Sequence, residues 1–174
     1  GAHKGDYYAI ILGAVVGMCF MALAADIIML YLAVETTGIA GYVLAGYVHR
    51  SSRSAEAGLK YFLFGAATSA VMLYGLSLVY GFTGETNLTA IASVLASGKV
   101  GISVILASAI LILVGVGFKI AIVPFHFWAP DVYEGAPTPV TGFISTAAKT
   151  AGFAVLIRVF ITGLTASEYW LPIL

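Results

Sequence analysis

The sequence has little charge. Only 9% of its 174 residues are charged, whereas soluble domains carry about 25%. A water-soluble fold is therefore excluded. The net charge is zero, so the basic surface that nucleic-acid binding requires is lacking, and no nucleic-acid partner is expected. The single cysteine, Cys19, excludes a disulfide within the chain, and we expect it to be a small residue of the core.

Signals for metal and nucleotide binding are also lacking. The three histidines are scattered, and no Cys or His has the spacing of metal ligands, so we expect no metal. Gly115-Val116-Gly117 has no strand–turn–helix context, and neither a phosphate loop nor a nucleophile elbow occurs. We therefore expect no cofactor in this chain and no redox chemistry from it alone.

Long apolar stretches fill most of the chain, and 61% of the residues are hydrophobic. A helix needs ~20 mostly apolar residues to span a bilayer. None of the stretches alternates apolar and polar residues as a membrane β-strand would. We predict an all-α integral membrane protein, a single domain over residues 1–174 in a lipid bilayer. Five transmembrane helices are expected at about residues 7–25, 27–48, 55–82, 101–128 and 140–164.

Helix-breaking and helix-capping residues refine these limits. Pro124 has no amide hydrogen, and its ring clashes with the carbonyl of Ile120. The fourth helix is therefore predicted to be discontinuous near Pro124, bending or breaking just after Lys119. Asp26 and Ser54 are placed to cap the second and third helices.

The connections differ in charge on the two sides of the membrane. One side carries Lys4, His49, Arg50 and Arg53, and the other carries Asp26, Glu85, Lys99 and Glu168. By the positive-inside bias, the loops with Arg50 and Arg53 are predicted to be cytoplasmic, in a bacterial plasma membrane. The chain starts at Gly1 without a signal-peptide pattern, so we expect it to be an excerpt of a longer protein.

Several charges fall inside the predicted helices. A charge at the bilayer centre costs roughly 2.5 to 3.5 kcal/mol, so it usually faces a partner or a watery cavity. Glu35 and Lys149 fall near mid-membrane, and Lys119 precedes the break, where free carbonyls and helix ends can hold water or ions. A desolvated lysine can release its proton, whereas an arginine cannot. Arg158 lies about half a turn from Lys149 and is interpreted as a packing or partner contact.

Structural alternatives stay open for these residues. Glu56 precedes Lys60 by four positions, the favourable order for a helix-surface ion pair, so Lys60 is equally an interfacial anchor. Glu35 and Lys119 are alternatively a buried structural pair. His126 is either a proton relay or a hydrogen-bond partner of the backbone freed by the break.

Two motifs carry a family resemblance. The sequence GFKIAIVPFHFWAPDVYEGAPTPV over residues 117–140, followed by STAAK over 145–149, closely resembles the subunit N family of proton-pumping NADH:quinone oxidoreductase, complex I. Related antiporter-like subunits share the lysine and Pro-Phe-His, but Trp-x-Pro-Asp-Val-Tyr-x-Gly-x-Pro is typical of subunit N. Residues 34–35, 53–61 and 76–84 also match that family.

The resemblance implies a fold, a function and a setting. It implies that the chain corresponds to about the fourth to eighth helices of a longer subunit, one half of an inverted-repeat antiporter-like fold. It also implies proton translocation through Glu35, Lys60, Lys119 and Lys149, with His126 as a possible relay. The expected partners are other membrane subunits of complex I, and NADH, FMN, iron–sulfur clusters and quinone are expected in the rest of the complex.

These residues suggest a mechanism with two rivals. In the hypothesis, Glu35 and a nearby Lys60 stabilise one another, and the field of this pair alters the proton affinity of Lys119, which exchanges protons with Lys149 through water. One rival is a subunit of a cation/proton antiporter or a membrane-bound hydrogenase. The other is a structural scaffold subunit whose charges only hold the helices together.

Overall fold

The chain forms a bundle of helices in the computed structural model, which describes residues 4–48 and 51–164. Five helical segments are long and apolar enough to cross a membrane, as predicted. Arg50 lies outside the described residues. The elements are α1 (Lys4–Leu23), α2 (Ile27–Ala45), α3 (Ser52–Thr83), α4 (Leu88–Ala96), α5 (Ile102–Ile120), α6 (Trp128–Gly135), α7 (Thr138–Phe143), η1 (Ile144–Ala148), α8 (Lys149–Ile157) and η2 (Arg158–Gly163), where η denotes a π-helix.

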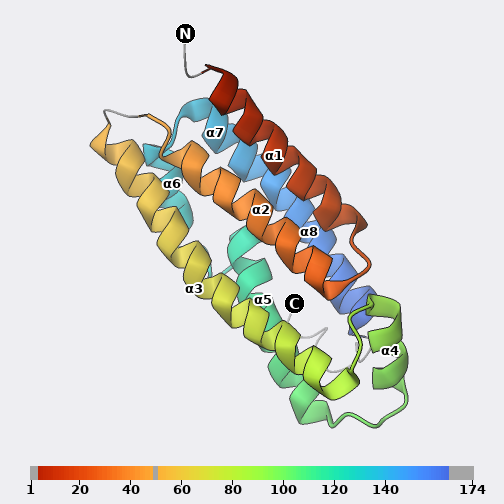
Figure 1. The fold of residues 1–174 in the computed structure, drawn as a ribbon. Coiled ribbons are helices and arrows are strands. Elements are labelled where there is room, and N and C mark those ends of the chain that lie inside the picture. Colours follow the sequence, from red (N-terminus) through yellow and green to blue (C-terminus); the bar gives the residue numbers. More distant parts are fainter. Residues whose placement is uncertain (1–3, 49–50, 165–174) are drawn as a thin grey trace.

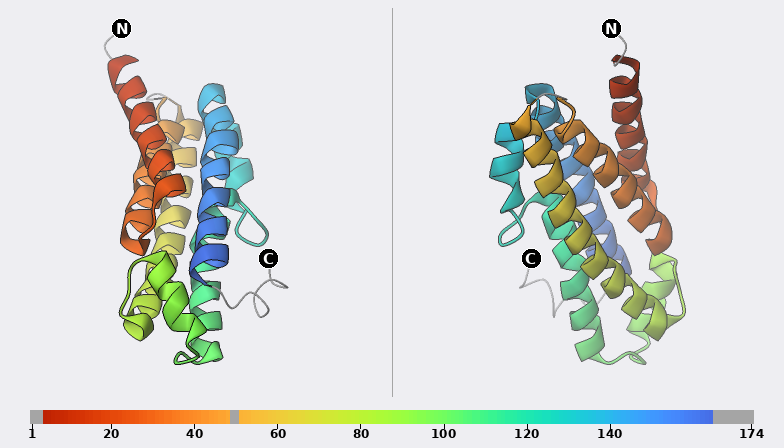
Figure 2. Two further views of the ribbon diagram at one scale, coloured as in Figure 1. Left: turned by 90° about the vertical axis from the view of Figure 1, so that its right-hand side faces the viewer. Right: turned by 60° about the vertical axis from the view of Figure 1, so that its left-hand side comes forward.

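The long helices pack side by side, with α1 beside α2 and α3 alongside α5 (Figure 1). The run from α7 to η2 forms the fifth spanning-length segment, Thr138–Gly163. The short helices α6 and α4 lie toward opposite ends of the bundle (Figure 2). The α6 helix packs on the first half of α3, so the two pieces of the fourth predicted span, α5 and α6, both contact α3.

The third helix starts earlier than predicted. Ser51, rather than Ser54, is its N-cap, because the Ser51 side chain accepts the amide hydrogen of Ser54. The Ser54 hydroxyl instead donates to the carbonyl of Ala45 at 2.8 Å, and it accepts from the amide of Val48. This contact satisfies a carbonyl at the end of α2, which stops at Ala45, three residues before the predicted limit.

A short helix, α4, lies in the segment that was predicted to be only a connection. Asn87 caps it by accepting from the amides of Thr89 and Ala90. Its buried residues Leu88, Ile91 and Leu95 lie on one face, the spacing of an amphipathic helix. This face packs against η2, which explains why so short a segment is helical.

Three chain segments meet at the end of the bundle where α4 lies. Asp26 caps α2 as predicted, by accepting from the amides of Ile28 and Met29. Backbone hydrogen bonds of 2.9 Å link this turn to the start of α4. The Arg158 guanidinium donates to the Ala24 carbonyl at 2.9 Å, where a cation also complements the end of α1. Arg158 is therefore a packing contact, as interpreted from the sequence.

Glycines bring α3 and α5 close together. A Cβ atom on Gly75 would lie 2.9 Å from the Ile112 amide nitrogen, and one on Gly115 would lie 2.5 Å from the Met72 Cβ atom. Close helix packing through small residues is typical of membrane bundles. The expectation for Cys19 was wrong, because it lies on the exposed side of α1.

Candidate functional site

The fourth span is broken beside a buried lysine. The α5 helix ends at Ile120, one residue after Lys119, and α6 begins at Trp128. Ala121 closes α5 in the left-handed conformation, with φ of 55°. The Trp128 indole donates across the break to the carbonyl of Phe118 at 3.2 Å, which satisfies one of the free carbonyls of the helix end. The predicted discontinuity of the fourth helix is confirmed.

Aromatic stacking holds this break in place. The rings of Trp128 and Tyr61 stack with centroids 4.4 Å apart and planes 8° from parallel. Both side chains are almost fully buried. Because Tyr61 belongs to α3, the stack joins the start of α6 to α3. Trp128 also packs at 5.0 Å against Phe118, which precedes Lys119.

Lys119 is nearly enclosed, with only 4% of its surface exposed. Its ammonium donates to the carbonyl of Val34 at 3.5 Å, which is long for a hydrogen bond. The last turn of a helix favours a positive charge because its carbonyls point outward. Lys119 is therefore held by weak polar contacts rather than by a close counter-ion.

A small cavity is lined by both Lys119 and Glu35. It has ≈10 Å³ of space for the centre of a water molecule, which is about the room that one water needs. No ion pair within 4 Å joins Glu35 and Lys119 in the described part of the chain, so they are not a direct structural pair. The polar residues around the cavity are Glu35, Tyr42, Thr68, Ser69 and Lys119.

The carboxylate of Glu35 is held from the opposite helix. The Ser69 hydroxyl of α3 donates a short hydrogen bond to Glu35 Oε1. The same hydroxyl oxygen lies 3.0 Å from the phenol oxygen of Tyr31. Glu35 is half-buried, whereas Ser69 is buried. Ser69 could not be predicted as a site residue, because one serine in an apolar helix has no distinguishing pattern.

Lys149 lies on the neighbouring element, directly after the π-helical segment η1. Such segments often occur at functional sites. Its ammonium lies 5.4 Å from the centroid of the Tyr133 ring, a cation–π contact. One turn further on, a Cβ atom on Gly152 would lie 3.4 Å from Cγ of Lys119. The stem of Lys119 therefore packs on the helix that carries Lys149.

His126 lies in the turn between α5 and α6. Its Nδ1 atom is buried and has no hydrogen-bond partner within residues 4–48 and 51–164. The ring stacks on Phe127 with centroids 5.0 Å apart. The Nδ1 atom thus does not hold the freed backbone, which was one of the two interpretations of this residue. The Tyr133 hydroxyl is likewise buried without a partner among the described residues.

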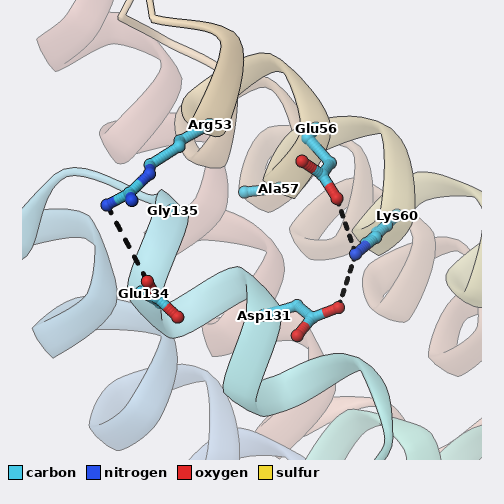
Figure 3. A pocket seen from close by; sticks show the side chains of 7 residues that line it. All are labelled: Arg53, Glu56, Ala57, Lys60, Asp131, Glu134 and Gly135. Atoms are coloured by element: carbon cyan, nitrogen blue, oxygen red, sulfur yellow. Dashed lines mark hydrogen bonds and ion pairs between the residues drawn. The ribbon is translucent and has the colours of Figure 1, made fainter.

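Lys60 lies in a different environment, an open cluster of charges between α3 and α6 (Figure 3). Its ammonium pairs with Glu56 at 2.7 Å and with Asp131 at 2.6 Å. Arg53 and Glu134 form a looser pair at 3.8 Å beside them. These residues border a pocket with ≈140 Å³ of space for water centres. The ion pair of Glu56 with Lys60, on which one of the two interpretations of Lys60 depended, is present.

The hypothesis that Glu35 and Lys60 stabilise one another is wrong. The partner of Glu35 on α3 is Ser69, nine residues after Lys60, which is ~13.5 Å along the helix axis. Lys60 forms ion pairs with the carboxylates of Glu56 and Asp131 instead. The sequence did not reveal Asp131 as a partner, because only the fold brings α6 against α3.

No group of three or more His, Cys, Asp or Glu side chains that could hold a metal ion occurs in the described parts of the chain. The site instead offers two buried or half-buried lysines, a carboxylate, hydroxyls and an unpartnered histidine nitrogen. All of these are groups that donate, accept or exchange protons.

Comparisons with known proteins agree on one family. Residues 24–174 match the family model described as NADH:quinone oxidoreductase/Mrp antiporter, TM. Over 156 residues, the chain is 49% identical to NADH-quinone oxidoreductase subunit N 2 of Chloroherpeton thalassium, covering 90% of this chain and 30% of that relative.

Two solved structures share the fold. In respiratory complex I from Thermus thermophilus with bound aureothin, one chain matches with a TM-score of 0.77 and 40% identity, covering 88% of this chain and 34% of that one. A chain of the Mrp complex from Dietzia sp. matches with a TM-score of 0.81 at 22% identity, covering 94% and 30%. The chain therefore spans about a third of the length of these proteins.

Proposed function

Because this chain belongs to the NADH:quinone oxidoreductase/Mrp antiporter transmembrane family, we propose that it is part of subunit N of a proton-pumping NADH:quinone oxidoreductase. In this function, electron transfer from NADH to quinone elsewhere in the complex drives protons through Glu35, Lys119 and Lys149. The observation that carries the proposal is the burial of Lys119 at the end of the helix α5, where the fourth span is broken. Lys119 lines the same cavity as Glu35.

The weak contacts of Lys119 suit a group that gains and loses a proton. A close carboxylate would hold the ammonium permanently, whereas a carbonyl at 3.5 Å does not. At an effective dielectric of ~20, a unit charge ~8 Å away contributes about 2 kcal/mol, enough to move a proton equilibrium more than tenfold. A change in the charge or position of Glu35 therefore decides whether Lys119 holds its proton.

Lys149 is the next proton acceptor in this scheme. The α8 helix packs on α5, and the stem of Lys119 contacts Gly152 one turn after Lys149. In this scheme, water and His126, whose Nδ1 atom has no hydrogen-bond partner among the described residues, relay protons between the two lysines. Lys60 stands outside the proton path, because it is fixed between Glu56 and Asp131. Its role is to anchor α6 on α3.

The setting follows from the same proposal. The chain lies in a bacterial plasma membrane beside other membrane subunits of complex I, with the end of α3 that carries Arg53 on the cytoplasmic side. NADH, FMN, iron–sulfur clusters and the quinone are bound by other subunits. A cation/proton antiporter is the second candidate, because the Mrp complex shares this fold, and a membrane-bound hydrogenase remains a related alternative.

Replacing Lys119 by Met in the full-length parent tests the proposal. After assembly of the complex is confirmed, quinone reduction and proton uptake are measured together in sealed membrane vesicles. We expect both to be lost, because Met fills the space of the lysine stem without a group that exchanges protons. Normal rates of both would contradict the proposal and favour the scaffold role, in which the charge only holds helices together.

A further inference from the structure

The hydroxyl of Ser69 bridges two helices at the carboxylate of Glu35. Ser69 is 7% exposed and lies on α3, whereas Glu35 lies on α2. Most hydroxyls in spanning helices donate to a carbonyl of their own helix. Thr68, its neighbour in the same cavity, does so at 2.8 Å to Phe64. Buried Ser108 on α5 does so at 2.8 Å to Val104.

The direction of the hydrogen bonds follows from the number of protons. Ser69 has one hydroxyl hydrogen, and an ionised carboxylate can only accept, so this hydrogen points to Glu35. The phenol of Tyr31, 3.0 Å from the same oxygen, must then donate to Ser69. The result is a chain of two donors that ends on the carboxylate. When Glu35 is protonated, both bonds can reverse without any heavy atom moving.

We propose that Ser69, supported by Tyr31, is a positioning residue that holds the ionised Glu35 carboxylate at the cavity it shares with Lys119. The geometry has this effect because Ser69 and Glu35 both border the cavity, and the bond fixes one carboxylate oxygen. Hydrogen bonds to charged groups are about twice as strong as neutral ones. The inference rests on the proposed function, since it assigns Ser69 a role only through Glu35.

Replacing Ser69 by Ala in the full-length parent removes the donor and leaves the helix intact. We expect quinone reduction and coupled proton uptake to fall about tenfold, a loss of about 1.4 kcal/mol. The Ser69→Thr variant, which keeps the hydroxyl, is expected to restore most of the rate. Ser108→Ala is the matched control, a buried serine that does not line this cavity, with an expected change below about twofold, because its hydroxyl donates to the Val104 carbonyl of its own helix.

A double variant separates positioning from packing. If Ser69 acts through Glu35, adding Ser69→Ala to Glu35→Gln changes nothing further, since residues that act as a unit are not additive. If the rate loss of the double variant equals the product of the losses of the two single variants, the proposal is overturned. A normal rate in Ser69→Ala with an impaired Glu35→Gln would refute this inference alone. Normal rates in Glu35→Gln and Lys119→Met would refute the proposed function itself.

The infrared absorption of the carboxyl group provides a readout that needs no turnover. The band of Glu35 is identified by its loss in Glu35→Gln. We expect it to shift in Ser69→Ala and less so in Tyr31→Phe, and to stay unchanged in Ser108→Ala. If Ser69→Ala does not assemble, Tyr31→Phe, which removes only one oxygen atom, carries the test. An unshifted band in the assembled Ser69→Ala or Tyr31→Phe complex would contradict the proposal.

Discussion

Lys60 and Lys119 are both lysines within spanning-length helices, yet they lie in opposite environments. The side chain of Lys60 is 37% exposed and contacts two carboxylates within 3 Å. Lys119 is 4% exposed, and among the described residues the hydrogen bond of its ammonium goes to the Val34 carbonyl at 3.5 Å. The partner of the ammonium, and not the residue type or its position within an apolar helix, separates a fixed ion pair from a group poised to exchange a proton.

Physical chemistry explains the difference. An exposed ion pair is screened by solvent, and its cation stays charged because two carboxylates surround it. A buried cation without a close counter-ion responds strongly to any nearby change of charge, because the surroundings screen it little. The first environment suits anchoring of α6 on α3, and the second suits proton transfer.

Trp128→Ala would disturb both environments at once and is expected to have the largest effect. The indole stacks on Tyr61, next to Lys60, and bonds the carbonyl of Phe118, next to Lys119. Truncating a buried aromatic side chain to Ala costs about 3–5 kcal/mol. Thermal unfolding of the purified complex measures the loss. Phe127→Ala, at an exposed neighbouring position, is the control and should change stability little.

Glu35→Gln alters the surroundings of the buried Lys119 and leaves those of Lys60 unchanged. The change removes the negative charge beside Lys119 while it keeps the shape of the side chain. We expect quinone reduction and proton uptake to fall at least about tenfold, since at an effective dielectric of ~20 a unit charge ~8 Å away is worth about 2 kcal/mol. The matched control is Glu56→Gln at the exposed cluster. Equal losses in both variants would remove the distinction between the two sites.

Asp131→Asn tests the exposed side and should have a modest effect. Lys60 keeps its ion pair with Glu56, so the cluster remains partly formed. We expect the rates of quinone reduction and proton uptake to change less than about threefold, the usual range for exposed ion pairs. The measurement is proton uptake in vesicles at low and high salt. A loss as large as that of Glu35→Gln would place Asp131 in the proton path.

Replacing Asp26, a carboxylate outside the spanning helices, is expected to have the smallest effect on stability. The hydrogen bond from the Thr86 side chain is the largest cause that lowers the pKa of Asp26 below the usual 3.8; burial opposes it, and the hydrogen bonds from the Ile28 and Met29 amides lower the pKa further. A lowered pKa means that Asp26 stabilises the fold above pH ~4, and that this stability is lost as pH falls through the lowered value. Asp26→Asn still caps the helix, and it should weaken the pH dependence of the free energy of unfolding below pH ~4. An unchanged pH dependence would contradict the assignment.

Much of the fold follows from local sequence signals. The five apolar stretches, the cap at Asp26 and the break before Pro124 depend on residues close together in the chain, so they could be predicted. The start of α3 was missed by three residues because Ser51 and Ser54 are equally good caps by type. The helix α4 was missed because its short apolar face is buried only where it packs against η2, which lies far away in the sequence.

The site was predictable in its charges but not in its contacts. Glu35, Lys119 and Lys149 stand out because charges are expensive inside a membrane. The pairing of Lys60 with Asp131, 71 residues apart, depends on how α6 returns to α3. The bond from Ser69 to Glu35 likewise joins two helices. Such long-range contacts are decided by packing, which a single sequence does not encode in any local pattern.

Paired arginine variants distinguish a Lys119 that exchanges a proton from a Lys60 that is only a fixed charge. Arginine keeps the positive charge but does not release its proton. Lys119→Arg and Lys60→Arg are compared in assembled complexes by proton uptake and quinone reduction in sealed vesicles. We predict that Lys119→Arg loses both activities and that Lys60→Arg retains both. Full activity in Lys119→Arg would show that a permanent charge suffices there and would contradict proton exchange at this residue.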